Sequence, residues 1–232
     1  MIAVMKEIKL KYLLLCALLG VFVGVINPMV CHIQWPIANL LPFFSEIMTF
    51  FTFFIIVGCV LIVKAPNRAS AAFGTFAFFV LYIIAYYPTE MVVSGYDHLN
   101  GMMWTWGAIA LLTLPGAAFV SFYNSENKVL SVFAGAAPLV GMFLQLVLYV
   151  GVLIKNPHYE VYNSARGRIM DVAPGPFIII NRIICVLIAL GFIVWWTRQL
   201  PKGLKGRLLT YACIPLVGAV MGGLYILVWH II

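Results

Sequence analysis

Residues 129–154 read VLSVFAGAAPLVGMFLQLVLYVGVLI and contain no charged side chain. Apolar residues would occupy every face of a helix built from this stretch, rather than a single stripe. About 20 consecutive apolar residues are enough to cross the ~30 Å hydrocarbon core of a bilayer as a helix. The stretch therefore predicts a transmembrane helix, and similar runs occupy most of the chain.

The composition of the whole chain fits this prediction. Of its 232 residues, 64% are hydrophobic and 9% are charged, whereas an ordinary soluble domain carries about 25% charged residues. A transmembrane β-barrel is excluded, because its strands alternate apolar and polar residues over about 10 positions. We predict an all-α fold: a single integral membrane domain over residues 1–232, built as a polytopic bundle of transmembrane helices.

Short polar breaks divide the chain into spans. Pro, Asn, Gly and charged residues mark these breaks, as they do in loops. Pro88 is expected to end the third span. We expect seven spans, and six if either the sixth or the seventh does not cross. The expected spans are residues 11–30, 46–64, 70–87, 102–122, 129–154, 177–197 and 208–231.

Basic residues are divided unequally between the two sides that seven spans define. The side of the N-terminus collects Lys6, Lys9, Lys11, Lys64, Arg68, Lys128, Arg198, Lys202, Lys205 and Arg207. Since an excess of Lys and Arg marks the cytoplasmic side, we expect a cytoplasmic N-terminus and, with seven spans, an extracytoplasmic C-terminus. The expected location is a bacterial-type plasma membrane. The net charge of +7 then reflects orientation and contact with membrane lipids, not nucleic-acid binding.

The most polar interruption of the apolar pattern is residues 86–106, YYPTEMVVSGYDHLNGMMWTW. Glu90, Asp97 and His98 are expected in an outer connection, where a carboxylate and an imidazole can bind a cation, hold a proton or contact a cationic solute. Trp104 would lie below them and stack on a ligand. The same residues also fit a solvated loop with an aromatic belt, in which Trp and Tyr anchor the chain at the interface.

The loop 155–176 forms a second polar group, and it carries basic residues on the outer side. Its Arg166 is a candidate to bind an anionic solute or a lipid headgroup. Internal pairing of Arg166 or Arg168 with Glu160 or Asp171 explains the same residues without a ligand. Both interpretations are open at this point.

Charged and polar residues also occur inside the spans. Arg182 lies about one turn into the sixth span, and Gln145 lies in the middle of the fifth. An ionisable residue inside a membrane is costly and is by default a functional hypothesis, although near the surface it can extend its charge into water. If Arg182 faces the bundle, Asp171 or Glu90 is its expected partner.

Small residues recur at helical spacing in two spans. Gly20 and Gly24 lie four residues apart in the first span, and Gly218 and Gly222 in the last. Such pairs let two helix backbones approach closely in lipid. They indicate either packing within the bundle or contact with protein partner subunits. Prolines that would bend their helices and open a cavity are Pro115, Pro138 and Pro215.

The sequence contains no motif of a common catalytic or cofactor-binding type. It has no GxSxG, Walker A, GxGxxG, HExxH or CxxCH pattern, and its five cysteines show no metal-binding spacing. No catalytic residue, metal site or cofactor is predicted. Enzymatic activity from dispersed residues is left open, although no pattern favours it.

Several segments resemble a family of small bacterial multipass membrane proteins without assigned activity. They are LLGVFVGVINPM (18–29), IANLLPFF (37–44), KAPNRASAAFG (64–74), IAYYPTE (84–90) and MMWTWGAIALLTLPGAAF (102–119). The resemblance covers roughly residues 13–154 and implies a compact helical bundle. In size, span number and basic character the chain is also similar to the substrate-binding membrane subunits of energy-coupling-factor vitamin importers, which is an analogy of topology.

Three functions fit these observations. The first is a small-solute-binding or transport-related membrane subunit with an outward-facing polar pocket. Its candidate ligand-binding residues are Glu90, Asp97, His98, Trp104, Arg166 and Arg182. The second is a non-transport accessory, immunity or sensor-type membrane protein. The third is an intramembrane enzyme on lipid-linked substrates, with Glu90, Asp97 and His98 as acid and base groups.

Overall fold

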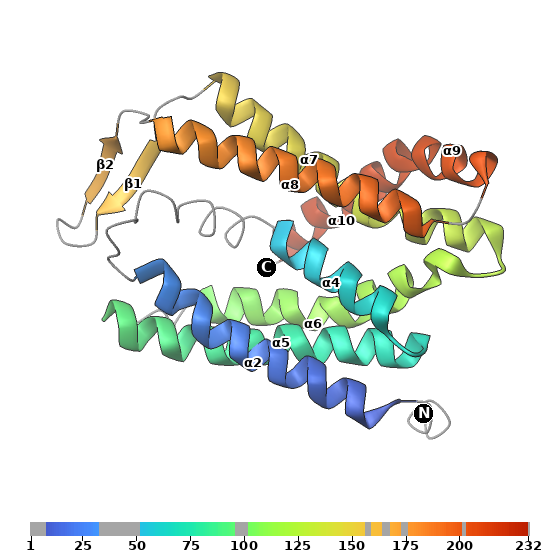
Figure 1. The fold of residues 1–232 in the computed structure, drawn as a ribbon, viewed down its shortest axis with the longest axis horizontal. Coiled ribbons are helices and arrows are strands. Elements are labelled where there is room, and N and C mark those ends of the chain that lie inside the picture. Colours follow the sequence, from blue (N-terminus) through green and yellow to red (C-terminus); the bar gives the residue numbers. More distant parts are fainter. Residues whose placement is uncertain are drawn as a thin grey trace.

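The computed structural model describes most of the chain. It describes residues 8–32, 52–95, 102–155, 159–163, 168–172, 176–200 and 203–231. The helices are α2 (Leu10–His32), α4 (Thr52–Lys64), α5 (Arg68–Ser94), α6 (Met102–Val120), the short 3-10 helix η2 (Ser121–Asn124), α7 (Lys128–Lys155), α8 (Pro176–Gln199), α9 (Leu204–Ala212) and α10 (Ile214–Ile231). The all-α prediction is confirmed, apart from one short hairpin described below (Figure 1).

Six helical segments of the described chain are long and apolar enough to cross a membrane. They correspond to every expected span except the second. The described part of that span, α4, has 13 residues, or about 20 Å at 1.5 Å per residue. Residues 46–51, where this span was expected to begin, lie outside the described residues. The chain is therefore a multispanning membrane protein.

The third span is longer than the sequence indicated. The expectation that Pro88 ends it is wrong, since α5 continues past Pro88 to Ser94. A proline inside a helix removes one backbone donor, here the one that would bond to Ile84 O, and transmembrane helices tolerate this because neighbouring groups can satisfy the freed carbonyl. The helix ends instead at Gly95, whose φ of 72° is left-handed and whose N–H donates to Met91 O at 3.0 Å.

The last expected span is divided in two. α9 ends at Ala212, and α10 begins at Ile214. The break falls at Cys213, two residues before Pro215, which has no backbone N–H to continue the helical hydrogen bonds across this point. The candidate membrane segment here covers Lys205–Gly223, so it begins a few residues before the expected start at 208.

The helices form two groups with α4 between them (Figure 1). In the first group, α5 packs against both α2 and α6. In the second group, α7 packs against α8, α9 and α10. One buried cluster joins both groups through side chains such as Cys59 of α4, Tyr123 of η2 and Trp196 of α8.

The contact between α2 and α5 is the most extensive between any two described helices. A Cβ added at Gly24 would lie 2.6 Å from Tyr82 O and 2.9 Å from the Cβ of Ala85, and one at Gly20 would collide with the backbone of Phe78. Small residues in lipid act by permitting this close approach. Gly20 and Gly24 therefore pack within the bundle, one of the two outcomes that the sequence allowed.

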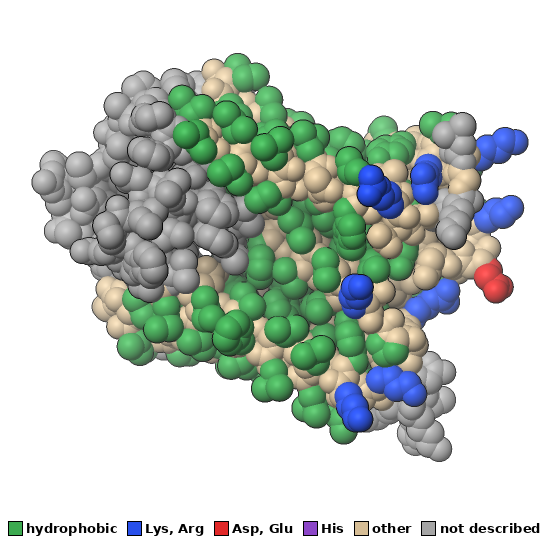
Figure 2. Space-filling model, viewed as in Figure 1, with side chains coloured by type: hydrophobic (Ala, Val, Ile, Leu, Met, Phe, Trp, Pro, Cys, Tyr) green, Lys and Arg blue, Asp and Glu red, His purple; other side chains and the backbone are tan. Residues whose placement is uncertain are grey.

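Basic side chains collect at one end of the bundle, which we call the basic end. Figure 2 shows Lys and Arg gathered toward the N-terminal side of the view. Hydrogen bonds tie the helix ends together there: Lys9 N donates to Ser70 Oγ at 3.0 Å, and Trp196 Nε1 donates to Gly135 O at 2.8 Å. The guanidinium of Arg68 lies 4.6 Å from the ring centre of Phe122.

At the opposite end, the chain between α7 and α8 forms an antiparallel hairpin of β1 (Tyr159–Asn163) and β2 (Arg168–Val172) (Figure 1). The sequence predicted only a loop here. The backbone register places Glu160 opposite Asp171 and Arg168 opposite Asn163. The side chains of the hairpin, and Arg166 altogether, lie outside what the structure describes, so internal pairing with Glu160 or Asp171 stays a prediction.

Candidate functional site

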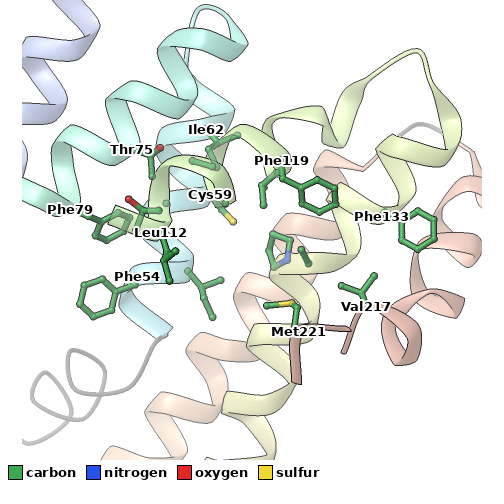
Figure 3. Close-up of a pocket in the computed structure, with 18 of the residues that line it drawn as sticks. Phe54, Cys59, Ile62, Thr75, Phe79, Leu112, Phe119, Phe133, Val217 and Met221 are labelled. Atoms are coloured by element: carbon green, nitrogen blue, oxygen red, sulfur yellow. The ribbon is translucent and has the colours of Figure 1, made fainter. Parts of the chain in front are cut away.

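A cavity of about 1040 Å³ lies between the two helix groups. Figure 3 shows side chains from both groups around this space, such as Phe79 of α5 and Met221 of α10. α4, α6 and α7 complete the described lining. Ligand sites for small molecules typically occupy ~300–1,000 Å³, so this cavity has room for a large ligand.

The walls of the cavity are almost entirely apolar. Thr75, Thr113 and Asn127 are the described lining residues with polar side chains. Two of them have local partners: Thr113 Oγ1 donates to Ala110 O at 2.6 Å, and Asn127 Oδ1 accepts from the backbone N–H groups of Val129 and Leu130 at the start of α7. The cavity is therefore built for hydrocarbon rather than for a charged solute.

Thr75 is the exception among the polar lining residues. It is 2% exposed, and within the described part of the chain its hydroxyl has no hydrogen-bond partner. A buried hydroxyl without a partner costs free energy. The hydroxyl oxygen is itself inaccessible, so Thr75 contributes to the wall of the cavity without presenting its hydroxyl to the open space.

The cavity extends along the helices rather than across them. Its lining on α6 begins at Trp106 and reaches Val120, a separation of about 21 Å at 1.5 Å per residue. At one limit Trp106 stacks on Phe54, with ring centres 5.7 Å apart and an interplanar angle of 17°. At the other limit the lining reaches Asn127 at the basic end. An elongated molecule fits this shape best.

Small residues leave this space open. Gly58, Gly116 and Ala137 line the cavity from three different helices. A Cβ added at Gly116 would meet no described atom within 4 Å. Pro138, one of the prolines expected to favour a cavity, also lines it.

The predicted site residues lie elsewhere. Glu90 is half-buried near the end of α5, and Trp104 is 74% exposed on α6. Arg182 is 6% exposed in α8. These three are absent from the described lining of the cavity. The other candidates, Asp97, His98 and Arg166, lie outside the described residues.

Arg182 belongs to a second, smaller group of buried polar residues at the hairpin end. One turn further along α8, Cys185 packs in one cluster with Tyr149 of α7. The hydroxyl of Tyr149 lies 2.7 Å from Thr52 Oγ1, so this hydrogen bond connects α7 to α4. Gln145, one turn from Tyr149, is also buried. The group places a buried cation within the membrane-spanning part of α8, where both Arg182 and Tyr149 have further interactions.

The sequence did not predict the cavity, because the predicted site was based on polar residues. Polar residues are unusual in a membrane-spanning chain and are easy to find in the sequence, but an apolar binding space contains few of them. The available signals were weaker: glycine, alanine and proline within spans, at Gly58, Gly116, Ala137 and Pro138. These residue types also serve ordinary helix packing, so the sequence alone does not separate the two uses.

Comparison of the chain with protein-family models, with curated proteins and with solved structures finds no match. The resemblance to small bacterial multipass proteins therefore stays a prediction. The function has to be argued from the geometry alone.

Proposed function

We propose that the protein is a membrane subunit that binds a small apolar or amphipathic molecule inside the bilayer, in a transport-related role. The observation that supports this function is the cavity between the helix groups, with its large volume and apolar walls. Interiors of folded proteins are close-packed and contain few voids larger than a water molecule. The space in this protein is instead an open groove, since lining side chains such as Leu112 and Val220 are more than half exposed, and its size lets an apolar molecule of the bilayer fill it.

The arrangement of the walls favours a changeable site over a fixed structural one. Elements of both groups line the cavity, whereas direct contact between α6 and α7 is slight compared with that between α5 and α6. A small displacement of one group against the other would change the width of the cavity. This is the kind of motion by which helix groups open and close a site during transport.

In this proposal the basic end faces the cytoplasm, because excess Lys and Arg marks that side. The N-terminus is then cytoplasmic, and the hairpin end with Arg182 and Glu90 faces outward. The outward-facing polar pocket expected from the sequence stays part of the proposal.

A pair of glycine variants on one helix tests this function. Gly116 lines the cavity and Gly107 does not, and a Cβ at either position would meet no described atom within 4 Å. We expect a photoreactive fatty alcohol to label cavity residues such as Leu112 and Met221 in the wild-type protein. Gly116→Leu should reduce this labelling several-fold, because its side chain fills the space.

The matched Gly107→Leu variant should be labelled like the wild type. Mass spectrometry of the digested protein locates the label. Equal labelling of the wild type and Gly116→Leu, or label distributed evenly over all lipid-facing helices, would contradict an intramembrane binding site.

A second candidate is an accessory membrane protein that binds a partner subunit. Gly222 and Gly223 of α10 favour it, because both are exposed and an added Cβ at either would meet no described atom within 4 Å. Small residues on a lipid-facing surface suit close packing against another helix. Cysteine crosslinking from Gly222→Cys to a copurified protein tests this, and its absence in native membranes would count against it.

A further inference from the structure

The cavity reaches the basic end of the bundle. Val120 at the end of α6, Asn127 before α7 and Val129 in its first turn all line it. These residues belong to the connection between α6 and α7, which lies at the same end as the turn between α4 and α5. A molecule in the cavity therefore has one terminus among apolar helices and the other near the charged end.

Exposed cations surround this end. Lys64 ends α4, Arg68 begins α5 and Lys128 begins α7, and all three are exposed. Glu126 is the one acidic side chain among the described residues at the basic end. Figure 2 shows one acidic group there, beside several basic ones. The backbone donors in the first turn of α7 are partly used by Asn127 Oδ1. The cationic side chains, rather than the helix terminus, would therefore hold an anion here.

The length of the cavity matches a lipid chain. Its lining on α6 covers about 21 Å, and one leaflet of the hydrocarbon core is about 15 Å thick, half of the ~30 Å total. An acyl chain can thus lie along the cavity while its headgroup stays among the cations.

We propose that the occupant of the cavity is an anionic glycerophospholipid, with an acyl chain between α6 and α10 and its phosphate near Lys64, Arg68 and Lys128. The inference rests on the proposed intramembrane binding function and names its ligand class. Two independent features agree with it: the apolar wall suits the acyl chain, and the exposed cations suit the phosphate.

Native mass spectrometry of the delipidated protein tests the proposal with two lipids of identical chains. The probes are dioleoyl phosphatidylglycerol, which is anionic, and dioleoyl phosphatidylcholine, which is zwitterionic. We expect the anionic lipid to be retained at least tenfold more strongly. Each single variant, Lys64→Gln, Arg68→Gln or Lys128→Gln, should weaken binding of the anionic lipid about fivefold and leave the zwitterionic lipid unchanged.

Two further variants separate the cavity from the charged surface. Gly116→Leu should reduce binding of both lipids, and Val220→Trp, which fills the cavity from an α10 side chain that is 57% exposed, should do the same. Gly107→Leu should bind both lipids normally. Elution volume on size-exclusion chromatography establishes that each variant is folded.

The outcomes are distinct. A preference for the anionic lipid that persists in both Gly116→Leu and Val220→Trp would overturn the proposal, because the headgroup would then bind at the surface without the cavity. Cavity labelling by the fatty alcohol with no lipid preference would overturn the ligand class and leave the binding function intact. If the wild-type protein neither binds the two lipids nor is labelled in the cavity by the fatty alcohol, the ligand class and the binding function are both overturned.

Discussion

Glycines have opposite surroundings in two parts of this bundle. Between α2 and α5, Gly20 and Gly24 lie so close to the facing backbone that a single added carbon would collide with it. On α6 and α10, Gly116 and Gly222 have open space around them. The difference shows that small residues do two jobs in this protein. They join helices in the first group, and they leave room between the groups.

The largest effect is expected where the glycines touch. Gly24→Ala places a Cβ 2.6 Å from Tyr82 O, and overpacking of this kind costs about 3 kcal/mol or less in most cores. Here the obstacle is backbone, which yields little, so we expect about 3 kcal/mol. The apparent melting temperature should fall by about 6–12 °C.

The control for this variant is Gly107→Ala, which meets no described atom within 4 Å. It should be as stable as the wild type or slightly more so, since alanine favours helix by about 1 kcal/mol over glycine. If both variants melt alike, the close contact between α2 and α5 is wrong.

A smaller effect is expected within the second group, between α7 and α8. Trp196 is fully buried, and its indole N–H donates to Gly135 O at 2.8 Å. Trp196→Phe removes this bond and some packing, which should cost about 2 kcal/mol. Thermal melting in detergent measures the loss. A Trp195→Phe variant, at a less buried position of the same helix, should lose clearly less.

A still smaller effect is expected for the polar bond between α2 and α5. Asn27 Nδ2 donates to the hydroxyl of Tyr82 at 2.6 Å, and both side chains are buried. Hydrogen bonds between membrane helices contribute about 0.6 kcal/mol on average. Asn27→Leu should therefore lower the free energy of unfolding slightly. A double-mutant cycle with Tyr82→Phe should give a coupling energy of about 0.6 kcal/mol between the two side chains. A coupling energy of zero would mean that the bond does not form.

The smallest effect is expected where the glycines are open. Gly116→Leu and Gly107→Leu should both leave the melting temperature unchanged or slightly raised, because leucine is a better helix former than glycine. The two should differ only in ligand binding. A strong loss of stability in Gly116→Leu alone would show that the space beside Gly116 is filled by protein.

Much of the fold follows from the sequence because helix crossing is a local property. A run of apolar residues of sufficient length predicts a span without knowledge of its neighbours, and this succeeded for α2, α5, α6, α7 and α8. The errors concerned compensation between neighbours. Pro88 does not end α5, since transmembrane helices tolerate an internal proline whose freed carbonyl is satisfied by neighbouring groups, and the helix ends at the left-handed Gly95.

The candidate site was less accessible to sequence reasoning. The sequence-based candidates are polar or aromatic residues in an apolar chain. The described lining of the cavity does not include Glu90, Trp104 or Arg182. The other three candidates, Asp97, His98 and Arg166, lie outside the described residues. Their proposed role is untested. The cavity depends on which glycines lack a neighbour. Gly20 and Gly116 look alike in sequence, and only tertiary packing distinguishes them.

The most direct test of the intramembrane binding site is an experimental density map of the protein in a lipid nanodisc. If the cavity holds a lipid, we expect an elongated density between α6 and α10 that runs from Trp106 toward Asn127 and ends near Lys128. The Gly116→Leu protein should lack this density. A map in which α6 and α10 pack directly against each other, with no space between them, would contradict an intramembrane binding site.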